Sequence, residues 1–195
     1  MTAVLIGLAL LVVVFWTVGA YKRLVGMRLA YRSAFAQIDT HLKHRYTLIP
    51  TLVETVRSSL PHERETLQGV TSACNQAMQA NAVAAQNPVD AAAVRQMIDA
   101  EAVLGASLEM LSALAQANAD LLSNDTMRRL NEELATTEHR IAFARHAYND
   151  SVVQYNRALH QFPGSVVANM FGFRMAEPLQ SNQSPLERRQ GRGAG

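Results

Sequence analysis

Three charged residues occupy positions of apolar helical stripes in this sequence, where an apolar side chain is expected. In residues 31–56, one helix face is marked by steps of four and three, and Arg45 occupies one of its positions. In residues 134–162 the same alternation passes through Glu138 and Arg145. An unpaired charge in a helix core is very costly, so these side chains must pair or face a gap between helices. We expect a network that fixes helix register, with a partner- or ligand-binding site as the alternative.

Two Tyr–Asn pairs lie seven residues apart on the second of these stripes. Tyr148 and Tyr155 fall in the apolar seam, and Asn149 and Asn156 each lie one position away, at its flank. A buried tyrosine needs a partner for its hydroxyl group, and a flanking asparagine can supply one. Internal packing is the role we expect for these four residues, and the capping of a groove is the alternative.

Other combinations of residues offer little chemistry. Residues 62–66 begin like a zinc-protease motif, but Thr66 stands where the motif needs its second histidine. His41 and His44 share a helix face without a cysteine or carboxylate cluster, which favours solvated histidines over metal ligands. Cys74 lies on an apolar stripe and is expected in the core. Since no nucleophile–base pair stands out, we predict no enzyme, no metal site and no cofactor.

The body of the chain, residues 22–177, is predicted to be all-helical. It has few helix breakers and no run that alternates with period two. Prolines and a Ser–Asn–Asp cluster divide it into helices at about residues 22–60, 62–85, 89–119 and 125–162. Because short connections make successive helices antiparallel neighbours, we predict an antiparallel four-helix bundle in which the first and fourth helices are long.

The stripe of the first helix passes through Pro50 without a change of phase. A continuous helix with a kink at Pro50 is therefore predicted, rather than two helices. If Arg45 meets Glu138, the first and fourth helices pair in a single register. That register places Tyr21 opposite Phe162, so that the fourth helix ends where the first helix leaves the predicted membrane.

The first 21 residues carry no charged side chain. They contain an 18-residue apolar run from Ala3 to Ala20, broken only by Thr17 and two glycines. A bilayer-spanning helix needs about 20 apolar residues, so the run is just long enough. A cleaved signal peptide is the alternative, but it requires a basic n-region, which this segment does not have. We predict a single N-terminal transmembrane helix, residues 1–21.

Aromatic and basic residues mark the end of this predicted anchor. Trp16 and Tyr21 have the rings that favour a bilayer interface, and Lys22 and Arg23 begin a basic flank. The positive-inside rule then places the N-terminus outside and the C-terminal domain in the cytoplasm. The expected location is the inner membrane of a bacterium, as a single-pass protein.

Residues 163–173 follow the fourth predicted helix. They are apolar, include Phe171 and Phe173, and precede Arg174. We expect this segment to lie in the membrane interface as a second, weak anchor, with a fold back over the bundle core as the alternative. Residues 178–195 are polar and Gly-rich, which predicts a disordered tail.

Composition narrows the class of protein. The chain has 195 residues, 49% of them hydrophobic, and a net charge of +2. That is too much apolar material for a chain disordered throughout, and a single cysteine excludes a disulfide scaffold. Since the charges nearly balance, we expect no nucleic-acid partner.

Several blocks of the sequence carry a family resemblance: residues 37–39 (QID), 42–46 (LKHRY), 48–56 (LIPTLVETV) and 134–145 (LATTEHRIAFAR). In their order and spacing they resemble the LemA family of membrane-anchored bacterial proteins. Thr47 and Thr51 depart from it, since members usually have Asp and Asn at these places. The resemblance implies a helical bundle behind one N-terminal membrane helix. It implies no reaction, and associates the chain with envelope stress and membrane metalloproteases.

These observations leave two classes of function. The first is a non-enzymatic scaffold at the membrane, whose partners are the lipid bilayer and an unidentified membrane or cytoplasmic protein, with a membrane metalloprotease suggested by the resemblance. Its thin second and third helices can also accept another copy of the chain, giving a homo-oligomer. The alternative is a ligand- or metal-responsive sensor bundle, with its site either at the three charged residues of the stripes or at His41 and His44.

Overall fold

A computed structural model describes residues 2–179, except for the side chains of residues 2–6, 9 and 10. The described chain is helical and has no strand, which confirms the all-helical prediction. Its helices are α1 (Thr2–Ser59), α2 (Arg64–Gln86), α3 (Ala91–Gln116), α4 (Ala119–Ser123), α5 (Asp125–His160) and α6 (Gly164–Phe171). The tail predicted for residues 178–195 lies, from residue 180 onward, outside the described residues.

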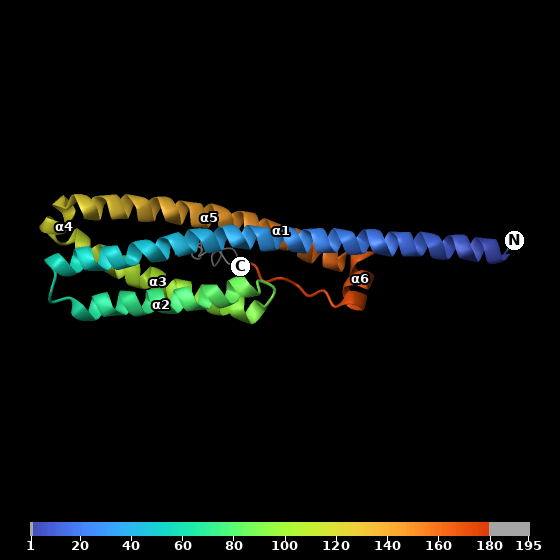
Figure 1. The fold of residues 1–195 in the computed structure, drawn as a ribbon, viewed down its shortest axis with the longest axis horizontal. Coiled ribbons are helices and arrows are strands. Elements are labelled where there is room, and N and C mark those ends of the chain that lie inside the picture. Colours follow the sequence, from blue (N-terminus) through green and yellow to red (C-terminus); the bar gives the residue numbers. More distant parts are fainter. Residues whose placement is uncertain (1, 180–195) are drawn as a thin grey trace, which may run out of the picture.

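Four long helices, α1, α2, α3 and α5, lie side by side in the part of the molecule away from the N-terminus (Figure 1). α5 runs antiparallel to α1 and packs against it, α2 packs against α1, and α3 packs against α2. In the described chain, α3 and α5 make little direct contact. The bundle is therefore open along one edge, between α3 and α5. The first part of α1 extends beyond the other helices (Figure 1).

The seam between α1 and α5 forms the centre of the core. The stripe residues of both helices are buried, among them Tyr31, Phe35, Ile38, Leu42, Ile49, Tyr148, Val152 and Tyr155. The ring centroids of Phe35 and Tyr148 are 5.7 Å apart, in an edge-on arrangement typical of packed aromatic pairs. α1 continues unbroken through Pro50, as the phase of its stripe predicts.

Side-chain caps explain where several helices begin. The carboxylate of Asp90 accepts a hydrogen bond from the backbone N–H of Ala92 at the start of α3. The side-chain oxygen of Asn124 accepts from the N–H of Met127 at the start of α5. Each cap satisfies a backbone donor that the first turn leaves free. The short helix α4 therefore ends directly before Asn124, the residue that caps the start of α5.

The predicted transmembrane helix is not supported. Among the residues that the structure describes, no helix is both long enough and apolar enough to cross a membrane. The fold class with an N-terminal transmembrane helix of residues 1–21 is therefore wrong in that element. A crossing helix requires about 20 successive apolar residues, whereas the apolar stretch in α1 gives way to Lys22 and Arg23 and the helix continues into the bundle.

The chain after α5 folds back over the bundle. Gly164 begins α6 so close to α5 that an added Cβ atom would lie 2.0 Å from the carbonyl oxygen of Ala158. α6 buries Val167 and Ala168 and contacts both α1 and α5. Gly172 ends the helix with φ of 69°, a left-handed conformation that glycine adopts without steric cost. An extended segment, residues 173–179, then runs back along the bundle, and we call it the strap.

Candidate functional site

A groove lies along the open edge of the bundle, between α3 and α5. We call it the α3–α5 groove. Its volume is about 580 Å³, which falls in the range of ligand-binding pockets. Leu108 and Leu134 contribute apolar wall surface, one from each helix, and Leu52 of α1 also lines the groove. The groove therefore exposes part of the bundle interior that a closed four-helix bundle would bury.

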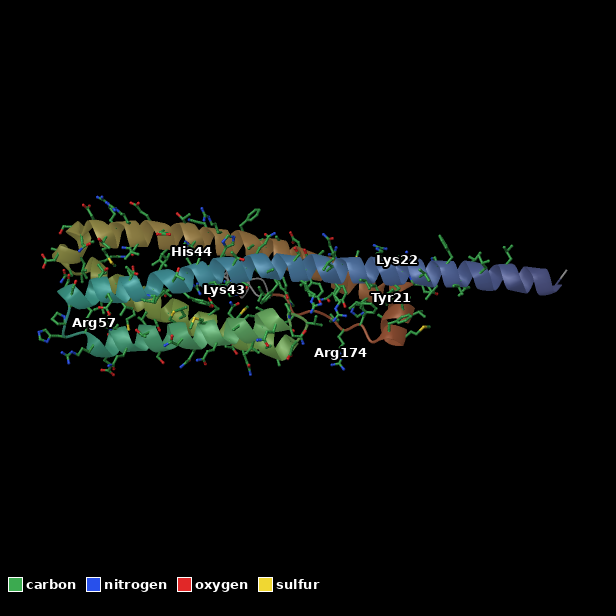
Figure 2. The ribbon with its side chains drawn as sticks, in the orientation of Figure 1. Tyr21, Lys22, Lys43, His44, Arg57 and Arg174 are labelled. Atoms are coloured by element: carbon green, nitrogen blue, oxygen red, sulfur yellow. The ribbon has the colours of Figure 1, made fainter. Side chains whose placement is uncertain are left out.

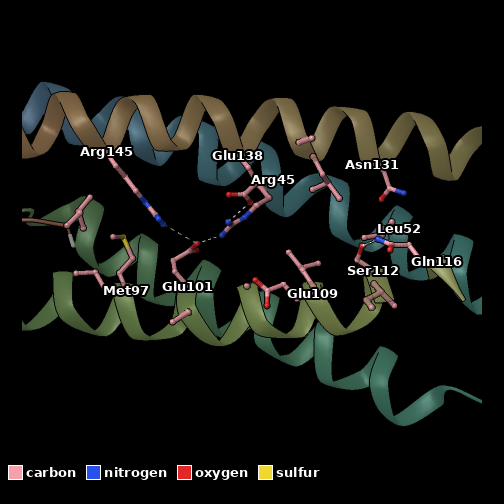
Figure 3. Close-up of a pocket in the computed structure, with 18 of the residues that line it drawn as sticks. Arg45, Leu52, Met97, Glu101, Glu109, Ser112, Gln116, Asn131, Glu138 and Arg145 are labelled. Atoms are coloured by element: carbon pink, nitrogen blue, oxygen red, sulfur yellow. Dashed lines mark hydrogen bonds and ion pairs between the residues drawn. The ribbon is translucent and has the colours of Figure 1, made fainter. Parts of the chain in front are cut away.

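A charged network lies inside the groove (Figure 3). Arg45, whose side chain is 4% exposed, donates from Nη1 to Glu138 Oε1 at 2.8 Å and from Nη2 to Glu101 Oε2. The hydroxyl of Tyr46 donates to the other oxygen of Glu101. The pair of Arg45 with Glu138, on which the sequence register was based, is thus present. It belongs to a larger cluster that links α1, α3 and α5.

Glu101 is the charged residue of this network that the sequence analysis missed. Its side chain is 4% exposed, and it compensates the charge of Arg45. The sequence does contain a sign of its burial. Glu101 lies on one helical stripe with Val94, Met97 and Leu104, at steps of three, four and three. An acid in the apolar stripe of α3 is the counterpart of the charges in the stripes of α1 and α5.

Arg145 reaches from α5 across the groove towards Glu101 on α3 (Figure 3). Its Nη2 lies 4.0 Å from Glu101 Oε2, which is too far for a hydrogen bond. Burial lowers the pKa of Arg145 below its ordinary value, although the nearby carboxylate of Glu101 opposes this. Its side chain is 25% exposed, so the guanidinium remains open to the groove. Arg145 is therefore the cation in the network that is best placed to receive a further anion.

The pKa of Arg45 shifts in the opposite direction. Burial alone would lower it, but the carboxylates of Glu101 and Glu138 more than offset this and raise it above its ordinary value. Burial also raises the pKa of the Tyr46 hydroxyl, and the charge of Glu101 adds to this. Arg45 is thus a fully compensated structural charge, unlike Arg145.

The second Tyr–Asn pair of α5 holds the strap by its backbone. The hydroxyl of Tyr155 donates to the carbonyl of Arg174 at 2.9 Å. The Asn156 side chain donates to the carbonyl of Ala176 at 2.9 Å and accepts from its N–H at 3.0 Å. This asparagine therefore replaces the pair of hydrogen bonds that a neighbouring strand would make.

The first Tyr–Asn pair repeats this arrangement further along the strap. The hydroxyl of Tyr148 donates to the carbonyl of Glu177 at 2.9 Å, and the Asn149 side chain donates to the carbonyl of Leu179 at 2.6 Å. Seven residues of helix advance about 10.5 Å, and three residues of extended chain advance about the same distance. The seven-residue repeat on α5 therefore matches a three-residue repeat on the strap. The two Tyr–Asn pairs thus have a structural role, which is to hold the strap against α5.

A family model described as the LemA family matches residues 34–190, most of the chain. The chain belongs to the LemA family. This confirms the resemblance seen in the sequence blocks. The matched region of this LemA chain contains the charged network, both Tyr–Asn pairs and the strap. A search of curated proteins found no match to the chain.

The aromatic residues predicted at a membrane interface gather at one end of the LemA bundle. Trp16 contacts Phe162, with ring centroids 4.6 Å apart. Tyr21 lies against Phe171 and Phe173, at 4.9 and 5.7 Å. The predicted register places Tyr21 opposite Phe162. In the structure Tyr21 instead contacts Phe171 and Phe173, because α6 folds back and brings these rings to it. Lys22 and Arg23 are exposed beside this cluster.

The histidines and the cysteine lie apart from the LemA groove. His44 Nε2 is 3.1 Å from Glu133 Oε1 at the surface, and Cys74 is buried. In the described part of the chain, no group of three or more His, Cys, Asp or Glu side chains is arranged to hold a metal ion.

Proposed function

We propose that this LemA-family chain is a non-enzymatic scaffold that binds one helix of a partner protein in the α3–α5 groove. The observation that carries the proposal is that α3 and α5 both line the groove but do not pack on each other. An added helix would lie between them and close the bundle. Helix-in-groove binding is a common way for a protein to recognise an amphipathic partner.

The groove has features suited to a helix. Ala102 and Gly105 on α3 are small, so a partner backbone can approach this wall closely. A Cβ atom added at Gly105 would meet nothing within 4 Å, which leaves space over the wall. Leu108 and Leu134 face the same space with apolar surface. A partner helix with apolar residues at steps of three and four would bury this surface.

Charge indicates what else the partner carries. Arg145 is open to the groove and makes only a long contact with Glu101. A carboxylate on the partner helix would pair with Arg145, whereas a basic residue there would be repelled by it. We therefore propose an amphipathic helix with an acidic residue on or beside its apolar face.

We place this scaffold at a membrane of the bacterial cell envelope, a location that LemA membership supports. The partner is a membrane or cytoplasmic protein, and a membrane metalloprotease is one candidate.

Site-specific photo-crosslinking in intact cells tests the proposal. A benzoylphenylalanine placed at Ser112 lines the groove, and one placed at Val103, which is exposed outside it, is the matched control. The expected result is a discrete adduct with another protein from Ser112 and none from Val103. Adducts only with a second copy of the chain, equal yields from both positions, or no adduct would each contradict the proposal.

A second candidate is a sensor that binds a small amphiphilic anion. The volume of about 580 Å³ and the open guanidinium of Arg145 favour it. Decanoate is a suitable probe, because its carboxylate would pair with Arg145 and its chain would lie along the leucines. It should raise the melting temperature of the wild-type chain and not that of Arg145→Gln. An equal shift, or no shift, in both proteins would exclude this candidate.

A further inference from the structure

One end of the bundle carries many large exposed apolar side chains. This end, where α6 folds against α1, we call the α6 end. Val166, Met170 and Phe171 project from α6 with exposures of 51, 66 and 53%. Other large apolar residues exposed at this end include Phe15, Trp16, Phe162 and Met175. Val167 and Ala168 hold the opposite face of α6 against the bundle, so its outward face is free to contact something else.

The α6 end has no acidic residue. The sequence contains 16 Asp and Glu, yet none lies in residues 1–38 or 151–176, which are the two segments that form this end. Six cations lie in the same segments: Lys22, Arg23, Arg28, Arg32, Arg157 and Arg174. The net charge of +2 for the whole chain therefore conceals a strongly positive end and a negative remainder.

Cations and aromatic rings stand beside the exposed apolar face. Lys22 is the next residue after Tyr21, which contacts Phe171 and Phe173 of the α6 region. Figure 2 shows Lys22 and Arg174 on the parts of α1 and the strap nearest α6, whereas Lys43 and Arg57 lie further along the bundle. The backbone of Arg174 is fixed by Tyr155, so its exposed side chain starts from a defined place.

We propose that the α6 end rests on the surface of a membrane that contains anionic lipids. Met170 and Phe171 enter the boundary between headgroups and acyl chains, and Lys22, Arg23 and Arg174 bind lipid phosphates. A surface that is apolar at its centre, aromatic at its edge and free of carboxylates matches an anionic bilayer in both polarity and charge. This contact is independent of the α3–α5 groove, and each can fail without the other.

Fluorescence from two labelled positions tests the proposal on the full chain. Met170→Cys places an environment-sensitive label on α6, and Leu122→Cys places it at a similarly exposed apolar position at the other end of the bundle. Cys74 is buried and stays unlabelled. Vesicles of phosphatidylcholine with roughly one-third phosphatidylglycerol provide the anionic surface, and pure phosphatidylcholine vesicles are the control.

We expect the emission of the label at residue 170 to shift to the blue on anionic vesicles and the label at residue 122 to stay unchanged. Lys22→Gln with Arg174→Gln should lower the vesicle affinity about thirtyfold, as expected for the loss of two cations near an anionic surface. Lys43→Gln with Arg57→Gln removes the same charge elsewhere and should leave the affinity unchanged.

Several outcomes would overturn the proposal. A label at residue 170 that stays in water when the chain is bound to vesicles would show that another part of the chain makes the contact. Equal affinity for neutral vesicles, or an equal loss in both charge variants, would remove the role of the cations. A blue shift without vesicles that grows with protein concentration would mean that a second copy covers α6.

Discussion

The guanidinium of Arg45 on α1 and the carboxylate of Glu101 on α3 form an ion pair in which each side chain is only 4% exposed. This pair lies at the base of the α3–α5 groove. Because α3 packs on α2 and hardly touches α5, the pair ties the α2–α3 hairpin to the rest of the bundle at this level. It therefore helps to set the spacing of the two groove walls.

Loss of Glu101 should be costly. Glu101→Ala removes the buried partner of Arg45, and removing one member of a buried ion pair typically costs about 3–5 kcal/mol of unfolding free energy. Glu138→Ala removes a carboxylate that is 50% exposed, and we expect a loss of at most about 1 kcal/mol. Urea unfolding followed by circular dichroism measures both variants. Equal losses would contradict the separate roles of the two carboxylates.

A double replacement separates the pair from its members. Arg45→Met with Glu101→Met removes both charges and keeps apolar volume in the core. The double variant should be more stable than Glu101→Ala, because no uncompensated charge remains buried. If the double variant loses as much as the sum of its single variants, the two residues do not act as a pair.

The strap should depend on the second Tyr–Asn pair. Asn156→Ala removes both hydrogen bonds to Ala176, and Tyr155→Phe removes the one to Arg174. Each bond contributes about 1 kcal/mol, so Asn156→Ala should have the larger effect. Hydrogen exchange of the Ala176 amide should speed up, and Val153→Ala, at an exposed position on α5, should leave it unchanged. Unchanged exchange in Asn156→Ala would contradict this reading.

Alkaline pH should weaken the same contacts. Burial raises the pKa of Tyr155 from 10.0 to about 12, and nearby Tyr31 adds to the shift. The stability from this raised pKa is fully present below pH 10.0 and is lost as the pH rises through about 12. Phenolate absorbance measures the titration, and unfolding at each pH measures the stability. The phenolate titration of Tyr155→Phe lacks one group, which is that of Tyr155. If the missing group has the ordinary pKa of a tyrosine, the raised pKa does not belong to Tyr155.

Gly164 should not accept a larger side chain. A Cβ atom at this position would lie 2.0 Å from the carbonyl oxygen of Ala158, so α6 would have to move away from α5. Gly164→Ala should lower the unfolding free energy by at least about 2 kcal/mol. Gly69→Ala, inside α2 with open space around it, should instead raise it by about 0.5–1 kcal/mol. A neutral Gly164→Ala would contradict the docking of α6 described here.

Much of the fold follows from the stripes in the sequence. The alternation of four and three in α1 and α5 predicts their pairing, and its unbroken phase predicts a continuous helix through Pro50. The assumed pair of Arg45 and Glu138 is formed, and Phe35 meets Tyr148 in the same register. Long apolar stripes specify their partners because only one register buries both of them.

The parts that could not be predicted lack such a pattern. α2 and α3 are Ala-rich, so their stripes do not reveal that α3 stays apart from α5. The strap is held largely by hydrogen bonds to its backbone, which every residue has, and its two buried side chains, Ala176 and Leu179, are too few to form a recognisable pattern. α6 owes its position to the close approach at Gly164, a three-dimensional contact. The predicted membrane crossing of residues 1–21 rested on the composition and length of the apolar run and on the aromatic and basic residues at its end, and not on a helical stripe.

The most direct test of the scaffold proposal is to fill the groove and follow the photo-crosslink from Ser112. Gly105→Leu places a side chain over the α3 wall, and Gly69→Leu makes the same change on α2, where there is also open space. We predict that Gly105→Leu abolishes the adduct with the partner protein and that Gly69→Leu leaves its yield unchanged, with both chains folded. A full yield of adduct from folded Gly105→Leu would show that no partner helix binds in the α3–α5 groove.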